Sequence, residues 1–256
     1  MIAGIWQIQS NHKVGEASVE EAFPFLNRKG NRISLVGAGG KTTLMHHLAE
    51  ELRKAGKRVI TTTTTHIMNP GSGNYIDASD DEFGSKIKLS LQNNNVVIVG
   101  HTAMDHKLSG LSNAELDELG SLCDCVLIEA DGAKGMPIKI PSVREPVIYP
   151  QSNIIIGVIG IDAVGKSMTE ACFRLTEAKA LFKVADGHIL TVEDCVTIAL
   201  SEDGTYKGVE NREFYLVINK CDNTEQQQLG AAMMEALLKT GKIPRSNMCM
   251  TSFITE

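Results

Sequence analysis

A glycine-rich turn ahead of a helix-forming run carries the clearest chemical signal in the sequence. Residues 33–43 read Ile-Ser-Leu-Val-Gly-Ala-Gly-Gly-Lys-Thr-Thr. Such a turn binds phosphate because glycines let backbone N–H groups converge on oxygen atoms, and the helix N-terminus adds positive potential. We predict that Lys41 reaches the β- and γ-phosphates of a nucleotide and that the Thr42 hydroxyl binds Mg²⁺. The other loop residues predicted to contact the nucleotide are Gly37, Ala38, Gly39, Gly40 and Thr43.

This loop departs at one position from the usual phosphate-binding spacing G-x-x-x-x-G-K-[ST]. Leu35 occupies the place of the first glycine. Gly37 and Gly39 supply the flexibility inside the loop instead. The alternative interpretation is a glycine-rich turn with an incidental lysine, and the strand before the turn and the helix after it argue against that alternative.

A second motif, Asn219-Lys220-Cys221-Asp222, directly follows the apolar run 214–218. GTP-binding proteins use this N-K-x-D spacing to contact the base. The Asp222 carboxylate can accept from N1–H and the N2 amino group of guanine, whereas adenine presents an acceptor at N1 and leaves the carboxylate unpaired. Asn219 would hold two loops together, the glycine-rich turn and the N-K-x-D turn. The aliphatic stem of Lys220 would lie over the ring of the base. The alternative is a polar turn that caps the strand.

Two acids, Glu129 and Asp131, follow the apolar run 126–128. Alternation along a strand directs both side chains to the same side. Beside a phosphate loop, a carboxylate at this strand end would complete the coordination of Mg²⁺, directly or through water. The sequence does not decide which of the two acids binds the ion. Lys41, Glu129 and Asp131 are therefore the predicted catalytic residues. Ordinary polar residues at a strand end are the alternative.

Five consecutive threonines, 61–65, and then His66 follow another strand-forming run. Hydroxyls at the carboxyl end of a strand could contact the γ-phosphate or the metal, but threonine is also an ordinary strand former. We therefore expect a function for only one or two of them. Thr64, Thr65 and His66 are the candidate switch or second-substrate residues, and His66 could be a base, a ligand or a loop residue.

Residues 134–150 contain four prolines and few helix formers. The stretch is predicted to be extended, and loops of this length are often functional. Its basic residues Lys134, Lys139 and Arg144 could contact an anionic second substrate, or they could form a solvated basic strip.

Strand-forming and helix-forming runs alternate along the chain, which predicts parallel strands joined by helical crossovers. We predict an α/β fold of the P-loop NTPase type: a doubly wound, mostly parallel sheet with helices on both faces and the site at the carboxyl ends of the strands. The predicted strands span 33–36, 58–63, 96–100, 125–130, 154–160 and 214–219. The predicted helices span 41–55, 114–122, 169–184, 192–200 and 226–240, and 69–81 is a predicted surface loop.

The length and composition of the chain fit a single domain. We place this domain at residues 31–256 and predict that residues 1–30 form a small helical lead-in that packs on it.

The net charge of −6 and the pI near 5.7 argue against a basic electrostatic field that would attract nucleic acid or an anionic membrane. No apolar run approaches the roughly 20 residues of a spanning helix, and the first ten residues lack the basic start of a signal peptide, so we expect a cytoplasmic location. The six cysteines form no C-x-x-C pair and are predicted to be reduced and buried.

Together these motifs resemble the YqeC-type selenium-dependent hydroxylase accessory proteins, also called selenium cofactor biosynthesis proteins. The matching segments are 36–43, 61–66, 129–134, the run 137–150 and 219–222, in the family's order. Tyr149 interrupts the family-like pattern Glu-Pro-Val-Ile-Pro that begins at Glu145. The resemblance implies a P-loop fold and a role in the maturation of selenium-dependent molybdenum hydroxylases, but it supplies no reaction.

The predicted function is Mg-nucleotide binding, with GTP favoured and ATP possible, together with slow hydrolysis or phosphoryl transfer. The expected cofactor is Mg²⁺. The resemblance implies as partners a selenium- or molybdenum-cofactor intermediate or a client hydroxylase. The alternative is a non-catalytic, nucleotide-gated module that delivers a metal or a cofactor, and the two differ in whether the γ-phosphate is consumed in each cycle.

Overall fold

Consecutive apolar residues build the centre of the sheet, because strands covered on both faces bury every side chain. The computed structural model of the chain describes residues 4–10, 13–68, 74–103, 107–184 and 187–254. Every residue of β9, Cys125–Glu129, and of β11, Ile154–Gly160, is buried. The other long strands are β3 (Asn31–Gly37), β4 (Val59–Thr63), β7 (Val96–Ala103), β13 (Glu213–Asn219) and β14 (Met248–Ser252).

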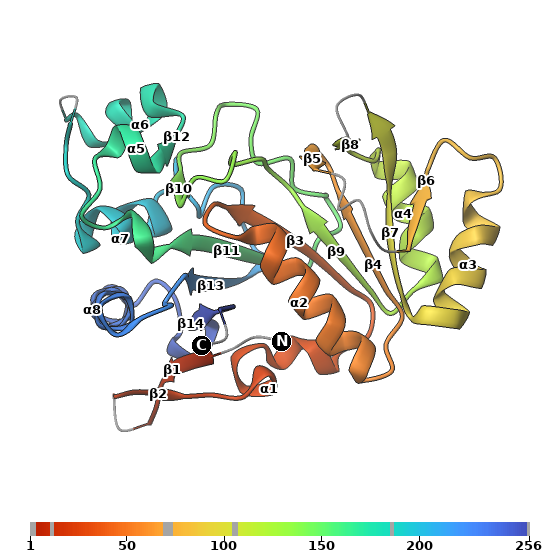
Figure 1. The fold of residues 1–256 in the computed structure, drawn as a ribbon, viewed down its shortest axis with the longest axis horizontal. Coiled ribbons are helices and arrows are strands. Elements are labelled where there is room, and N and C mark those ends of the chain that lie inside the picture. The colour runs from red at the N-terminus through yellow and green to blue at the C-terminus, as the bar shows by residue number, and fades with distance from the viewer. Residues whose placement is uncertain (1–3, 11–12, 69–73, 104–106, 185–186, 255–256) are drawn as a thin grey trace.

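The central strands lie in the order β14-β13-β11-β3-β9-β4-β7 and are all parallel (Figure 1). Their register aligns the carboxyl ends. Glu129 pairs with both Leu35 and Thr63, and Asn219 pairs with Gly160. The glycine-rich turn, the acids, the threonines and the N-K-x-D motif therefore leave the sheet at one edge.

Shorter strands extend the two sides of the sheet. On one side β1 (Gly4–Ile8) pairs antiparallel with β14 and with β2 (Val14–Glu16). On the other side β8 (Lys107–Ser109) pairs antiparallel with β7 and with β5 (His66–Met68), and β6 (Tyr75–Asp77) pairs in parallel with β7.

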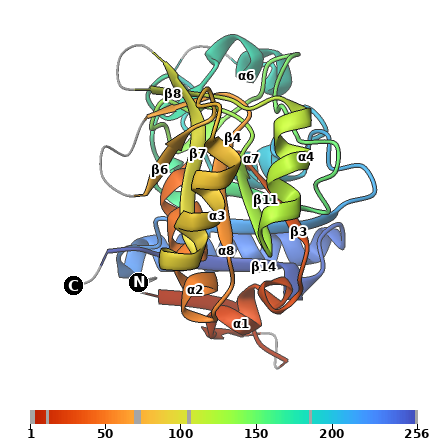
Figure 2. The same ribbon diagram turned by 90° about the vertical axis from the view of Figure 1, so that its right-hand side faces the viewer.

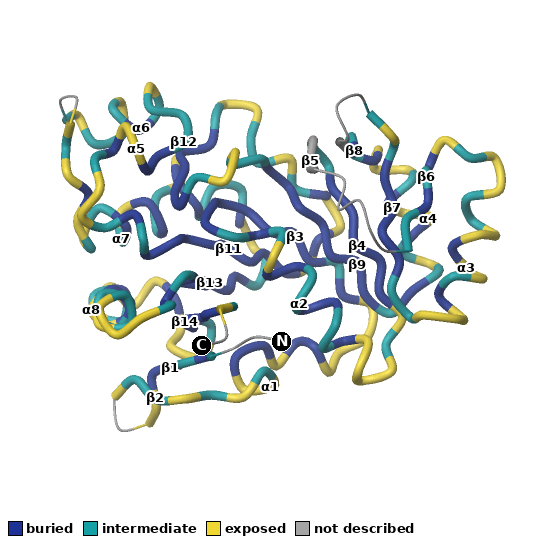
Figure 3. The backbone as a smooth tube through the Cα atoms, in the orientation of Figure 1, coloured by how far each residue is buried: buried dark blue, intermediate teal, exposed yellow. Residues whose placement is uncertain are grey.

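Helices cover both faces, as the sequence predicts. Leucines of α2, Lys41–Lys54, pack with one face of β3 and β9. The opposite face is covered by α3 (Phe83–Asn94), α4 (Asn113–Leu122), α7 (Val192–Leu200) and α8 (Thr224–Thr240). Figure 2 turns the β7 side toward the viewer, with α3 and α4 in front, and Figure 3 shows burial concentrated in the central strands. The doubly wound α/β fold is confirmed.

The predicted helix 169–184 is wrong. The chain instead forms two short helices, α5 (Met168–Ala171) and α6 (Leu175–Phe182), separated by β12 (Cys172–Phe173). β12 pairs in parallel with β10, Ile138–Lys139, and Arg174 has a left-handed backbone with φ of 71°. A strand pairing between segments far apart in the sequence thus overrides the local helical pattern.

The first thirty residues are less helical than predicted. β1 and β2 form a hairpin on the sheet edge, and helical structure is confined to α1 (Val19–Ala22) and a 3-10 turn at Pro24–Asn27. Further 3-10 turns lie at Ile161–Ala163 and Arg245–Asn247. Within the predicted loop 69–81, residues 69–73 lie outside the described residues, and β6 was not predicted.

All six cysteines are buried and free, as the sequence predicts. In the part of the chain that the structure describes, no helix is long and apolar enough to cross a membrane.

Candidate functional site

The turn between β3 and α2 requires glycine because three of its residues have left-handed backbone. Gly37, Gly39 and Gly40 have φ of 92°, 80° and 116°. A Cβ on Gly39 would lie 2.2 Å from the Gly160 nitrogen, and one on Gly40 would lie 2.3 Å from Asn219 Nδ2. The Gly39 N–H donates to the Met136 carbonyl at 3.0 Å, which ties the loop to the segment after β9. The loop is thus fixed in place at the N-terminus of α2.

Lys41 begins α2, and its ammonium group turns back into the loop. Nζ donates to the Gly37 carbonyl at 2.5 Å and lies 3.0 Å from Asp131 Oδ1 and 4.0 Å from Glu129 Oε1. The other Asp131 oxygen accepts from the Gly37 N–H at 3.2 Å. Lys41 is 3% exposed and Asp131 1%, and their pairing offsets the cost of burying both charges. The loop therefore holds a positioned cation at the place where a phosphate could bind.

The Thr42 hydroxyl donates to Glu129 Oε2 at 2.7 Å. Burial raises the pKa of the Glu129 carboxyl above its usual value, in spite of the nearby Lys41 ammonium and this hydrogen bond. A hydroxyl and a buried carboxylate side by side are oxygen ligands of the kind that Mg²⁺ prefers. These two residues would therefore suit an Mg²⁺ ion as ligands.

The N-K-x-D motif lies against the phosphate loop. Asn219 Nδ2 donates to the Gly39 carbonyl at 2.8 Å, and its Oδ1 accepts from the Thr251 hydroxyl at 2.9 Å. The half-buried Asp222 accepts from the Ser252 hydroxyl at 2.6 Å. Thr251 and Ser252 were not predicted as site residues. The available signal was a pair of hydroxyl residues at the end of the strand-forming run 248–252.

Lys220 turns toward the same region. Its backbone is left-handed, with φ of 63°, and its Nζ lies 3.2 Å from Asp162 Oδ2 at the end of β11.

The threonine run supports the strand ends more than it lines the site. Thr63 donates to the Glu129 carbonyl at 2.8 Å, and Thr64 donates to the Val147 carbonyl at 2.6 Å. Thr65 lines the cavity described below. The backbone of His66 begins β5, but its side chain lies outside the described part of the chain.

Lys139 lies inside the protein and not on a solvated strip. Its fully buried Nζ lies 3.2 Å from Asp131 Oδ2 and 3.1 Å from Glu145 Oε2, and it donates to the Gly132 carbonyl at 2.7 Å. Glu145 also accepts from Arg174 Nε and Nη2 at 2.7 and 2.9 Å. Glu145 and Arg174 were not predicted as site residues, because they meet only through the pairing of β10 with β12.

A cavity of about 770 Å³ opens beside the phosphate loop. Lys134 lines it, whereas the exposed Arg144 does not. The lining comes from the loop and α2, from the ends of β4 and β9, and from the segments after β9, β12 and β13: Gly39, Gly40, Lys41, Thr42, Thr43, Thr65, Glu129, Gly132, Ala133, Lys134, Gly135, Met136, Glu145, Phe173, Arg174 and Lys220.

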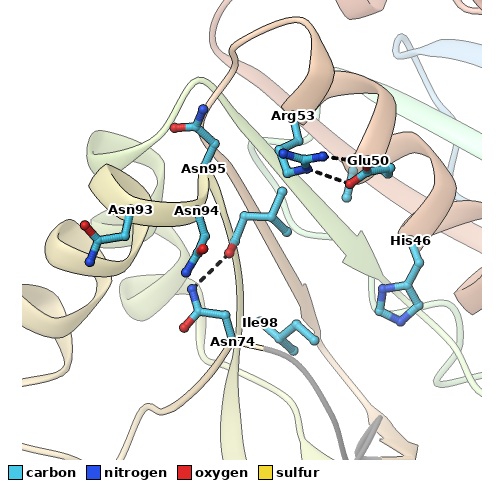
Figure 4. A pocket seen from close by; sticks show the side chains of 10 residues that line it. His46, Glu50, Arg53, Asn74, Asn93, Asn94, Asn95 and Ile98 are labelled. Atoms are coloured by element: carbon cyan, nitrogen blue, oxygen red, sulfur yellow. Dashed lines mark hydrogen bonds and ion pairs between the residues drawn. The ribbon is translucent and has the colours of Figure 1, made fainter.

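Another cavity, of about 620 Å³, lies between α2 and the end of α3, near the amino-terminal end of β7 (Figure 4). Its charged residues Glu50 and Arg53 hydrogen-bond each other at 2.7 and 2.8 Å, and Asn74 donates to the Val96 carbonyl at 3.1 Å. None of the site residues predicted from the sequence lines it.

The model of the YqeC protein family matches residues 33–176. The YqeC protein of Escherichia coli strain K12 is 32% identical over 204 residues, which cover 76% of this chain and 79% of that protein.

Two solved structures are more distant. FtsY from Mycoplasma mycoides is 14% identical with a TM-score of 0.38, over 87% of this chain and 62% of that chain. The signal recognition particle 54 kDa protein from Aeropyrum pernix K1, solved in complex with GDP, is 16% identical with a TM-score of 0.41, over 91% of this chain and 44% of that chain. This chain thus spans less than two thirds of either solved chain.

Glu145→Gln should destabilise the protein in a pH-dependent way. Burial alone would raise the Glu145 pKa, but Arg174 and Lys139 lower it from 4.5 to about 2. Because the folded-state pKa is depressed, the stabilisation is present above pH 4.5 and is lost as the pH falls toward 2. We expect the variant to lose about 3 kcal/mol of unfolding free energy at pH 7, measured by urea denaturation, and to lose less at pH 3.

The matched control is Glu50→Gln, which removes an exposed carboxylate paired with Arg53. It should change the unfolding free energy by no more than about 0.5 kcal/mol. An equal loss for Glu145→Gln at both pH values would contradict the ion-pair explanation.

Proposed function

The chain belongs to the YqeC family, and we propose that it is a P-loop protein that binds Mg-nucleotide, favours GTP, and hydrolyses the nucleotide slowly or transfers its γ-phosphoryl group. The observation that carries this proposal is the pairing of the first two residues of α2 with the acids after β9. Lys41 Nζ lies 3.0 Å from Asp131 Oδ1, and the Thr42 hydroxyl donates to Glu129 at 2.7 Å. P-loop proteins use a lysine, a hydroxyl and a carboxylate to hold the phosphates and the metal ion of a nucleotide.

The two acids have different roles in this proposal. Glu129 bonds the Thr42 hydroxyl, so these two residues would hold Mg²⁺. When bound, the ion neutralises charge on the β- and γ-phosphates. Asp131 is instead engaged by Lys41, by Lys139 and by the Gly37 N–H. It therefore positions the loop and its lysine.

The base site follows from the contacts of the N-K-x-D motif. Asn219 joins that motif to the phosphate loop through the Gly39 carbonyl, so base and phosphates would be held in a fixed relation. Ser252 donates to Asp222 Oδ1. This bond orients a carboxylate whose remaining acceptor capacity suits the N1–H and N2 amino donors of guanine.

The biological setting that we propose is the maturation of selenium-dependent molybdenum hydroxylases, in the cytoplasm. The support for this setting is the resemblance of the motifs to that group of accessory proteins. The partner in this setting is a selenium- or molybdenum-cofactor intermediate or the client hydroxylase itself.

The assignment of the two acids can be tested with conservative amides. Glu129→Gln should reduce the gain in nucleotide affinity that Mg²⁺ provides by about ten-fold, because it removes a ligand of the ion or of its water. Asp131→Asn should keep that gain and lower the thermal stability, since Lys139 and Lys41 lose a shared anion. The measurement is fluorescent-nucleotide titration with Mg²⁺ and with EDTA. Unchanged magnesium dependence in Glu129→Gln would refute its role.

Base choice tests the proposed function as a whole. Parallel calorimetric titrations of GTP, ATP and XTP with Mg²⁺ should show GTP binding on the order of 10²-fold more tightly than ATP, because the wrong base leaves the Asp222 carboxylate unpaired. Asp222→Asn should relax this preference and admit XTP, whose C2 oxygen accepts from an amide. The control Asp203→Asn alters an exposed loop aspartate and should change nothing. ATP binding equal to or tighter than GTP binding by the parent would overturn the guanine assignment.

A further inference from the structure

Lys134 lies in a turn and has a left-handed backbone conformation, which in turns is usually adopted by asparagine or glycine. The Met136 N–H donates to the Ala133 carbonyl at 3.0 Å, and the two residues between them have positive φ, 48° at Lys134 and 74° at Gly135. This is the pattern of a type I′ turn. A lysine there is strained by about 1 kcal/mol, and such strain is concentrated at functional sites.

The same strain recurs around the cavity. Among the described residues other than glycine, those with positive φ are Asn95, Lys134, Arg174, Lys183, Glu210 and Lys220. Half of them line the cavity beside the phosphate loop, and these three, Lys134, Arg174 and Lys220, are all basic. The backbone thus places three cations at the wall of one cavity.

The cations differ in how they are paired. Lys41 pairs with Asp131, Lys220 with Asp162, and Arg174 with Glu145. Lys134 is exposed and makes no ion pair with any residue that the structure describes; its Nζ lies 5.4 Å from the centre of the Phe173 ring. Arg174 lies over the same ring at 5.0 Å and uses only Nε and Nη2 on Glu145. Free donor capacity therefore remains at Lys134 and at Nη1 of Arg174.

These donors are separate from the phosphate loop but share its cavity. The loop residues Gly39 to Thr43 line the same cavity as Lys134, Phe173 and Arg174. In the proposed function Lys41 and Thr42 bind the triphosphate and its metal ion, and Lys134 and Arg174 have no role there. The cavity can thus accommodate a second anionic group beside the nucleotide.

We propose that Lys134 and Arg174 bind an oxyanion, a phosphate or carboxylate group, of a second small-molecule substrate while Mg-nucleotide occupies the phosphate loop. This inference rests on the proposed function and names the substrate class of its cavity. The ring of Phe173 lies beside both cations and gives the substrate an apolar surface next to its charged group.

The test uses the whole chain saturated with Mg²⁺ and a non-hydrolysable GTP analogue, at constant ionic strength. Inorganic phosphate and malonate are titrated separately by calorimetry, which distinguishes a phosphate site from a carboxylate site. At least one of them should bind. Lys134→Asn should weaken that binding by about ten-fold through loss of a charge-assisted contact. Its melting temperature should stay the same or rise, because asparagine tolerates left-handed backbone.

Lys183→Asn is the matched control, since Lys183 is also exposed and left-handed, with φ of 55°, but does not line the cavity. It should leave anion binding unchanged. The inference is overturned if neither anion binds the loaded protein, or if both variants weaken binding equally. If the GTP analogue itself does not bind, both the proposed function and this inference are wrong. If the analogue binds but neither anion binds the loaded protein, only this inference is wrong.

Discussion

The buried carboxylate of Asp131 is the interaction on which the rest of the site depends. One oxygen pairs with Lys41 at 3.0 Å; the other accepts from the Gly37 N–H and pairs with Lys139, both at 3.2 Å. The residue is 1% exposed, so each of these partners offsets a desolvation cost that the carboxylate could not otherwise meet. A single side chain thereby joins the phosphate loop, the start of α2 and the segment after β9.

Charge balance extends this constraint through the site. Glu129, Asp131 and Glu145 are matched by Lys41, Lys139 and Arg174 in a connected set of contacts. A triphosphate would add negative charge to this balanced cluster. The proposed Mg²⁺ ion at Thr42 and Glu129 compensates that charge, and the additional cation Lys134 remains for a second anion. Lys134, which makes no ion pair with any residue that the structure describes, would contact this anion together with Arg174.

The sequence predicted the parts of the site that are local in the chain. The strand, turn and helix around Lys41, and the strand end at Asn219, are read from neighbouring residues, and the parallel fold brings them together because register aligns the strand ends. The contacts of Lys139 with Glu145 and of Glu145 with Arg174 could not be read this way. They depend on β10 pairing with β12, which also breaks the predicted helix 169–184 at Arg174. Lys139, expected as a candidate for substrate contact, is buried for the same reason.

Ligand-induced stabilisation, compared between the parent and a Lys41→Ala variant, tests whether the loop binds the phosphates of the nucleotide. The melting temperature of the parent should rise with Mg-GTP concentration, since a ligand that binds only the folded state stabilises it by mass action. Lys41→Ala should lose this rise, whatever its own melting temperature, while Lys54→Ala on the exposed side of α2 should keep it. A rise in Lys41→Ala equal to that of the parent would contradict the assignment of the loop as the phosphate site.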